Sequence, residues 1–258
     1  MEFGVSPLSI VPIRKEPSDS SEQISQLLFG EYFRILKKEE KWWNVQLLYD
    51  EYEGWIDAKQ GVILSNIPEN SISKPEAMVF DMCSGATVGS DQIPLVLGAQ
   101  LDSFDGMHFR LAKKKGFYNG QVVYPGQNGL SIELIEKISS RYMNAPYLWG
   151  GRTPFGIDCS GFTQMVFKFL GIRLRRDAYQ QEEQGTAIDW LSEARKGDLA
   201  FFDNQEGRIT HVGILLSPEK IIHASGKVRI DKIDNYGIFR AEDKSYSHKL
   251  KSIKRISH

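Results

Sequence analysis

Several short β-type runs, made mostly of apolar residues, occur near the start of the chain. The runs cover residues 10–13, 32–36, 43–48 and 54–56. Charged or Ser- and Pro-rich segments such as Glu16 to Ser21 and Lys37 to Lys41 separate them. Short, regularly spaced β-type runs with turn residues between them are typical of a small β-barrel or sandwich. The N-terminal region is therefore predicted to be all β.

A second stretch repeats part of this pattern. Ser-Glu-Gln-Ile at residues 21–24 is followed by two Leu and Gly30. Ser-Asp-Gln-Ile at residues 90–93 is followed by Val, Leu and Gly98. A repeat with a period of about 69 residues indicates two related β modules. Residues 67–76, which include two Pro, are the predicted linker between them.

The apolar spacing becomes helical from Ser131 onward. One helix is predicted to begin at Ser131 and to end at Asn144, and a second is predicted from Cys159 to Leu170 with Gly171 at its C-cap. β-type runs follow at residues 198–202, 211–216, 220–223 and 228–233. The fold class expected is α+β, with two small all-β domains over residues 1–66 and 67–130 before a mixed domain over residues 131–258.

Composition excludes several classes of partner. The formal net charge is −1 and 25% of the residues are charged, without the clustered Lys and Arg excess of a nucleic-acid-binding protein. No apolar run is long enough to span a membrane, so no membrane partner is expected. No basic and then apolar leader is visible at the N-terminus, which predicts a cytoplasmic protein if Met1 is the native start. No protein partner and no cofactor are implied.

The sharpest local feature is Gly156-Ile157-Asp158-Cys159-Ser160-Gly161-Phe162. It puts Cys159 in the first turn of a helix, after a Gly-rich loop. Unpaired amide groups and the positive end of the helix dipole favour a thiolate at such a position, and the same amides can act as oxyanion donors. We therefore interpret Cys159 as a nucleophile, the alternative being a small buried apolar residue.

Two histidines are candidates for the base and its partner. His211 begins one apolar strand and His223 ends the next, with a turn at Ser217-Pro218 between them. An antiparallel hairpin would bring both histidines to the same end. His223 could then orient His211 by accepting a hydrogen bond. We predict His211 as general base.

Metal binding is the competing explanation for Cys and His together. Zinc needs three or four ligands, and only Cys159, His211 and His223 are plausible, without C-x-x-C or H-x-x-x-H spacing. No metal is predicted. His108, His248 and His258 lack supporting context, and Cys83 is interpreted as structural or incidental.

These motifs resemble the NlpC/P60 cysteine peptidases. The resemblance runs over about residues 131–258, in the order Tyr147 to Gly151, Asp158 to Phe162, Gly197 to Leu199, His211 to Ile214 and His223 to Ser225. The Arg176 to Gln181 segment also fits that family. The N-terminal repeats resemble bacterial SH3 modules, chiefly through their pattern and Gly54-Trp55. Together they resemble γ-D-glutamyl-L-diamino acid endopeptidases of the dipeptidyl-peptidase VI type.

The resemblance implies hydrolysis of the amide between D-Glu and L-Lys or meso-diaminopimelate in small murein peptides that carry a free N-terminal L-Ala. It places the nucleophile on Cys159, the base on His211 and the third polar residue on His223, with Tyr147 beside the nucleophile. Substrate contacts are expected from the side chains of Asp158, Ser160, Asp177, Glu31, Tyr52 and Trp149.

Other interpretations stay open at this point. Asp158 and Asp177 could simply cap helices, and Trp149 could be a packing residue. A wall-remodelling endopeptidase, an amidase or acyltransferase on the same fold, and a non-catalytic binding protein are the alternative functions. The choice between L-Lys and diaminopimelate and the oligomeric state are not predictable from these residues.

Overall fold

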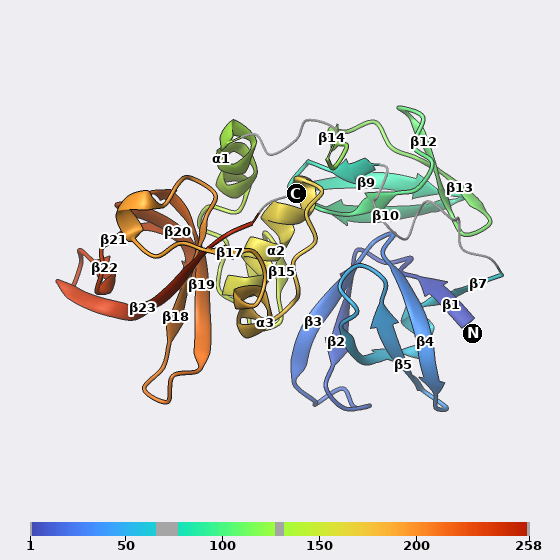
Figure 1. Ribbon diagram of the computed structural model, residues 1–258. Coiled ribbons are helices and arrows are strands. Elements are labelled where there is room, and N and C mark those ends of the chain that lie inside the picture. Colours follow the sequence, from blue (N-terminus) through green and yellow to red (C-terminus); the bar gives the residue numbers. More distant parts are fainter. Residues whose placement is uncertain (1, 66–76, 127–131, 257–258) are drawn as a thin grey trace. The chain divides into compact units, whose positions relative to one another are not determined.

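The computed structural model describes residues 2–65, 77–126 and 132–256 (Figure 1). The chain forms two compact units, residues 1–127 with 149–154 and residues 128–148 with 155–258. The predicted linker, both predicted domain boundaries and the predicted helix start at Ser131 lie outside the described residues. Each unit is treated separately below.

The first unit begins with a seven-stranded antiparallel sheet in the order β3-β2-β6-β5-β4-β1-β7. Its strands are β1 (Glu2–Val5), β2 (Ile10–Arg14), β3 (Gln23–Leu28), β4 (Tyr32–Lys38), β5 (Trp42–Leu47), β6 (Glu53–Asp57) and β7 (Val62–Leu64), with a 3-10 helix at Ala58–Gln60. Alternate residues such as Phe33 and Ile35, or Val45 and Leu47, point into one apolar core. The four predicted β runs are therefore confirmed as β2, β4, β5 and β6.

The rest of the first unit is also β. Its strands are β8 (Ala77–Val79), β9 (Cys83–Val88), β10 (Asp91–Val96), β11 (Gln100–Leu101), β12 (His108–Leu111), β13 (Lys114–Phe117), β14 (Val122–Val123) and β15 (Arg152–Thr153). The sheets run β10-β9-β13-β12 and β11-β8-β14. Val5 and Phe29 from the first sheet pack into the core of this second part, so the two parts share apolar packing.

The internal repeat has a structural counterpart. Both repeat segments are strands, β3 and β10, that precede a glycine with positive φ, +79° at Gly30 and +94° at Gly98. At Gly30 a Cβ atom would lie 2.1 Å from the carbonyl oxygen of Gln100. A side chain is thus excluded there both by φ and by the close approach of another segment.

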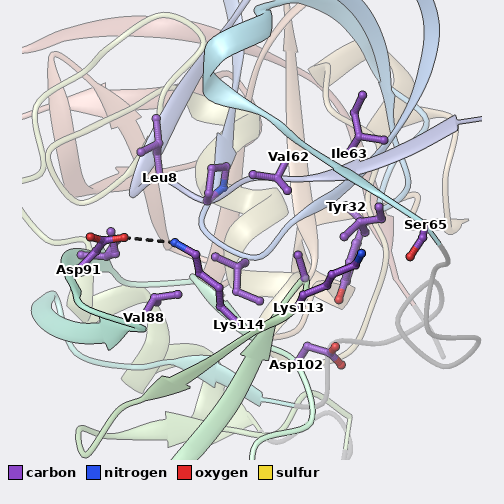
Figure 2. Close-up of a pocket in the computed structure, with 15 residues that line it drawn as sticks. Leu8, Tyr32, Val62, Ile63, Ser65, Val88, Asp91, Asp102, Lys113 and Lys114 are labelled. Atoms are coloured by element: carbon purple, nitrogen blue, oxygen red, sulfur yellow. Dashed lines mark hydrogen bonds and ion pairs between the residues drawn. The ribbon is translucent and has the colours of Figure 1, made fainter.

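A cavity of about 520 Å³ lies within the first unit, between residues of its two β parts (Figure 2). Apolar side chains such as Leu8, Val62 and Val88 line it, and Lys114 pairs with Asp91 at 3.3 Å. Its fifteen lining residues include none of the site residues predicted from the sequence.

The second unit combines a few helices with one large sheet (Figure 1). Its helices are α1 (Ile132–Arg141), α2 (Cys159–Phe169), α3 (Ala178–Glu182) and a 3-10 helix at Leu191–Glu193. Its strands are β16 (Gly156–Ile157), β17 (Thr186–Ala187), β18 (Leu199–Asp203), β19 (Ile209–Ser217), β20 (Lys220–Ser225), β21 (Lys227–Ile233), β22 (Gly237–Arg240) and β23 (Ser245–Arg255). Helix α2 is buried along its length and packs on β19 and β20.

The large sheet runs β17-β23-β18-β19-β20-β21-β22, and β22 also pairs with β23. Strands β18 to β23 therefore close into a barrel, with residues such as Phe202, Leu215 and Ile253 in its apolar core. The predicted β19–β20 hairpin is confirmed, with Gly213 opposite His223. Within the described residues no helix is long and apolar enough to cross a membrane.

Candidate active site

Cys159 is the first residue of α2. Asp158 is the N-cap, and its Oδ1 accepts a hydrogen bond from the Gly161 amide at 2.7 Å. Cys159 is only 5% exposed, and its Sγ lies 4.0 Å from the carbonyl oxygen of Thr210. The predicted placement of this cysteine in a first helical turn is confirmed, and strand β19 borders it.

The protonation state of this thiol differs from the sequence expectation. Burial, and next the negative charge of Asp158, raise the pKa of Cys159 to about 12. Amide groups of Val212 and Ser160 and the positive charge of Arg176 act in the opposite direction but do not prevail. The helix start alone therefore does not make a thiolate here, because desolvation and a neighbouring carboxylate outweigh it.

His211 and His223 meet across neighbouring strands, as the hairpin predicts. The Nε2 of His211 lies 2.8 Å from the Nδ1 of His223, and both side chains are buried. Burial, followed by the proximity of His248 and His223, lowers the pKa of His211 well below its ordinary value of 6.5. At neutral pH the imidazole of His211 is therefore uncharged and available as a base.

Asp231 extends this line and was missed by the sequence analysis. Its Oδ2 lies 2.9 Å from the Nε2 of His223, and Arg229 donates a hydrogen bond to its Oδ1 at 2.7 Å. Burial alone would raise its pKa, but the bonds from His223 and Arg229 hold that pKa below its usual value. A strand register could have found it: Arg229 is opposite His223, and Asp231 lies two residues further on the same face.

His248 was set aside for lack of context, and the structure corrects this. Its ring stacks on that of His211, with centroids 4.0 Å apart and planes 24° apart. Phe202 also contacts His211, with ring centroids 5.7 Å apart. Burial, then the nearby His223 and Arg240, lowers the pKa of His248 to about 4, so it is neutral at pH 7. This neutral ring helps to fix the plane of His211.

A second cluster surrounds the start of α2. The guanidinium of Arg176, only 1% exposed, donates to both carboxylate oxygens of Asp158 at 3.0 and 2.6 Å and to the hydroxyl oxygen of Ser160 at 3.0 Å. The capping role weighed for Asp158 is therefore confirmed, together with a buried ion pair. Arg176 was not among the predicted site residues.

Tyr147 also lies close to Cys159, Asp158 and Arg176. Its backbone amide donates to the carbonyl oxygen of Gly226 at 2.9 Å, and its side chain is partly exposed. Burial, then the negative charges of Cys159 and Asp158, raises the pKa of its phenol. The hydroxyl therefore stays protonated and able to donate a hydrogen bond.

Asp177 is the N-cap of α3, and its amide donates to the side-chain oxygen of Gln180 at 3.2 Å. The capping role weighed for this residue is thus also found.

The three other predicted site residues belong to the first unit. Glu31 is buried, and its carboxylate accepts hydrogen bonds from the Arg152 guanidinium at 2.8 and 2.9 Å. Trp149 is 59% exposed, and its indole N–H donates to Glu22 at 2.7 Å. Tyr52 lies in the turn between β5 and β6, where its carbonyl oxygen accepts from the Leu47 amide. These residues do not join Cys159 within one compact unit, and their substrate contacts stay a prediction.

Comparison with known proteins adds an independent line of information. Residues 144–242 match the model of the NlpC/P60 family, and residues 13–60 match the model of the bacterial dipeptidyl-peptidase SH3 domain. The γ-D-glutamyl-L-lysine dipeptidyl-peptidase of Bacillus subtilis (strain 168) is 28% identical over 225 residues, which are 78% of this chain and 71% of that protein. Dipeptidyl-peptidase 6 of Lysinibacillus sphaericus is 26% identical over 243 residues, 85% of this chain and 87% of that protein.

A solved structure shares the fold. The crystal structure of an NlpC/P60 family protein from Bacillus cereus ATCC 10987 covers 98% of this chain and 99% of its own, with a TM-score of 0.80 at 19% sequence identity. The mixed C-terminal fold and the SH3-like N-terminal domain expected from the sequence are therefore confirmed.

Proposed function

We propose that this chain, in which residues 144–242 match the NlpC/P60 family model, is a cysteine peptidase. It hydrolyses the γ-D-Glu–L-Lys or γ-D-Glu–diaminopimelate bond of murein peptides with a free N-terminal L-Ala. The products are L-Ala-γ-D-Glu and a peptide or amino acid that begins with the diamino acid. One observation carries the proposal: hydrogen bonds connect Asp231 to His223 and His223 to His211. His211 lies in β19, the strand that borders Cys159.

We propose the following positions for the protons along this hydrogen-bonded line. The Asp231 carboxylate only accepts, so the Nε2 of His223 carries a proton and its Nδ1 is an acceptor. The Nε2–H of His211 then donates to that Nδ1. This leaves the Nδ1 of His211 unprotonated and free to take the proton of the thiol.

His211 lies in β19 between two residues whose backbone groups interact with Cys159. Thr210 brings its carbonyl oxygen to 4.0 Å from Sγ, and the Val212 amide interacts with the thiol. Because the thiol pKa is raised and the imidazole pKa is lowered, the resting pair is neutral. Proton transfer from Cys159 to His211 accordingly accompanies attack on the substrate instead of preceding it.

Attack of Sγ on the γ-carbonyl of D-Glu forms a tetrahedral oxyanion. The Cys159 amide at the start of α2 and the protonated hydroxyl of Tyr147 are the donors proposed for it. His211 then protonates the leaving nitrogen, the C–N bond breaks and a thioester remains. Water, deprotonated by His211, attacks the thioester and releases L-Ala-γ-D-Glu and the free thiol.

The ammonium of the free N-terminal L-Ala requires a carboxylate partner. Asp158, Asp177 and Ser160 are the contacts that we propose from the second unit, and Glu31, Tyr52 and Trp149 those from the first. The buried charge of Asp158 and the relatives named for dipeptidyl-peptidase activity support this part of the proposal.

The finer organisation of the chain is part of the same proposal. It comprises SH3-like barrels over residues 1–66 and 67–130 and a peptidase domain over residues 131–258. The strand–glycine repeat of β3 and β10 supports two related modules. A requirement for a free N-terminus would suit peptides already released from the wall, and hence a role in recycling them in the cytoplasm.

Mass spectrometry of reaction products tests the proposal with L-Ala-γ-D-Glu-L-Lys, its diaminopimelate analogue and the N-acetylated form of each. Release of L-Ala-γ-D-Glu from the free peptides alone is expected. Cleavage of both free and acetylated peptides would support peptidase activity but contradict the proposed contacts with the N-terminal ammonium. Cleavage of neither would contradict the proposed function.

Two cysteine variants assign the nucleophile within the same assay. Cys159→Ala is expected to lower kcat by at least about 10⁴-fold, because no other group can form the thioester. Cys83→Ala, at an exposed cysteine in β9, is the matched control and should retain activity. Activity that survives Cys159→Ala would exclude it as nucleophile.

A further inference from the structure

A second cavity of the molecule adjoins the candidate active site. It is an open pocket of about 970 Å³ within the second unit. Its lining residues are Asp203, Asn204, Gln205, Gly207, Thr210, Tyr236, Tyr246, Ser247, His248 and Lys249. Two of them connect it to the chemistry: the carbonyl oxygen of Thr210 is 4.0 Å from the Sγ of Cys159, and His248 stacks on His211.

Asp203 is an unusual residue for the wall of such a pocket. It ends β18 at an irregularity in the pairing with β19, and its side chain is only 6% exposed. Its Oδ2 lies 3.5 Å from the Nζ of Lys251, whereas its buried Oδ1 has no hydrogen-bond partner among the described residues. A buried carboxylate with one unsatisfied oxygen is unfavourable by itself, so its negative charge favours a cation at the pocket wall.

The remaining wall is suited to an aliphatic chain with charged ends. Tyr236 and Tyr246 are 76% and 50% exposed, and their ring centroids lie 5.8 Å apart. The hydroxyl of Tyr246 donates to Asp234 at 2.5 Å, which holds that ring in place. Lys249 supplies a positive charge to the same pocket. Aromatic surface flanked by one negative and one positive group matches a zwitterionic residue with a methylene stem.

We propose that this pocket binds the diamino acid on the leaving side of the scissile bond. This inference rests on the proposed function. The leaving nitrogen must come within hydrogen-bond distance of His211 to receive its proton, so the residue that carries this nitrogen lies beside His211 and its stacking partner His248. The side-chain ammonium of that residue pairs with Asp203, its methylenes contact the tyrosine rings, and its carboxylate faces Lys249.

The test compares two substrates that differ only in the side-chain ammonium, L-Ala-γ-D-Glu-L-Lys and L-Ala-γ-D-Glu-L-norleucine. The wild-type protein is expected to have a kcat/KM about tenfold higher for the lysine peptide, as befits one partly buried charge pair. Asp203→Asn keeps the size of the side chain and removes its charge. It should abolish this tenfold preference by lowering kcat/KM for the lysine peptide.

Glu206→Gln is the matched control, because it removes one negative charge from the turn between β18 and β19 outside the pocket lining. It should leave the lysine preference unchanged. Equal rates on both peptides in the wild type, or a preference that Asp203→Asn does not change, would overturn the inference while leaving the peptidase intact. Failure of the wild type to release L-Ala-γ-D-Glu from either peptide would overturn the proposed function as well. Cleavage of the norleucine peptide by Asp203→Asn shows that the variant is folded.

Discussion

Two buried carboxylates of the second unit differ in how they are compensated, one at the start of α2 and the other at the end of β18. The carboxylate of Asp158 accepts hydrogen bonds from the Gly161 amide and from two nitrogens of the Arg176 guanidinium. Asp203 has one oxygen near the exposed Lys251 and the other without a hydrogen-bond partner among the described residues. The two aspartate side chains are thus similarly buried, but Asp158 has many more hydrogen-bond and ion-pair partners than Asp203.

The difference separates a carboxylate that already has a cation partner from one that the protein leaves undersatisfied. An ammonium that approached Asp158 would have to share it with Arg176, whereas at Asp203 it would meet a carboxylate that the protein itself leaves undersatisfied. Asp158 also acts on its neighbour, because its charge contributes to the raised pKa of the cysteine thiol. Four experiments test this contrast and the mechanism that depends on it.

The largest effect is expected in the pH dependence of thiol alkylation. In a Cys83→Ser background, the rate of modification of Cys159 by iodoacetamide should rise about tenfold per pH unit, or about a thousandfold from pH 7 to pH 10, because only the thiolate reacts. The raised pKa implies that the thiolate fraction is still increasing over this whole range. Circular dichroism at each pH controls for folding. A rate that levels off below pH 8 would instead indicate a thiolate–imidazolium pair.

Removal of the cation beside Asp158 tests the structural half of the comparison. Arg176→Met should lower the free energy of unfolding by about 3–5 kcal/mol, because Asp158 would be left buried without its ion-pair partner. Urea denaturation measures this. Adding Asp158→Asn, which retains a capping side chain, should restore part of the loss.

The counterpart at the other carboxylate is Asp203→Asn. It should change the unfolding free energy by less than about 1 kcal/mol, since its ion-pair partner Lys251 is exposed. Equal losses at Asp158 and Asp203 would contradict the contrast between them.

A further effect, on turnover, is expected behind the two histidines. Asp231→Asn should lower kcat about 10–100-fold with little change in KM, because the carboxylate orients His223 and His211 without touching substrate. Asp243→Asn, at an exposed aspartate, is the control. A loss that appears only in KM would contradict this positioning role.

Local sequence patterns were sufficient for much of the candidate site. The β-type runs at residues 211–216 and 220–223, with a turn between them, predict a hairpin whose histidines share one end, and these are the residues that meet at 2.8 Å. The helical spacing after Cys159 likewise locates that residue at the start of α2. Both features depend on interactions between residues close together in the chain, so periodicity reveals them.

The residues that were missed depend on longer-range pairing. His248 reaches His211 because β23 pairs with β18 and closes the barrel, a contact that no local pattern encodes. Asp203 becomes buried where the register of the β18–β19 pairing shifts. The expected thiolate failed for a related reason, since burial of Cys159 is a property of the packed domain and opposes the local effect of the helix start.

The first compact unit has a consequence for the order in which the protein forms. It includes residues 149–154, where Arg152 supplies the guanidinium that neutralises buried Glu31. Glu31 precedes Arg152 by 121 residues in the chain. At elongation rates of about 5–20 residues per second, synthesis of Arg152 follows that of Glu31 by about 6–24 s. During that interval the N-terminal barrel lacks the cation that its interior requires. The N-terminal unit can therefore be completed only after synthesis of the segment just before α2. A fragment that stopped at residue 127 would lack Arg152, the ion-pair partner of Glu31.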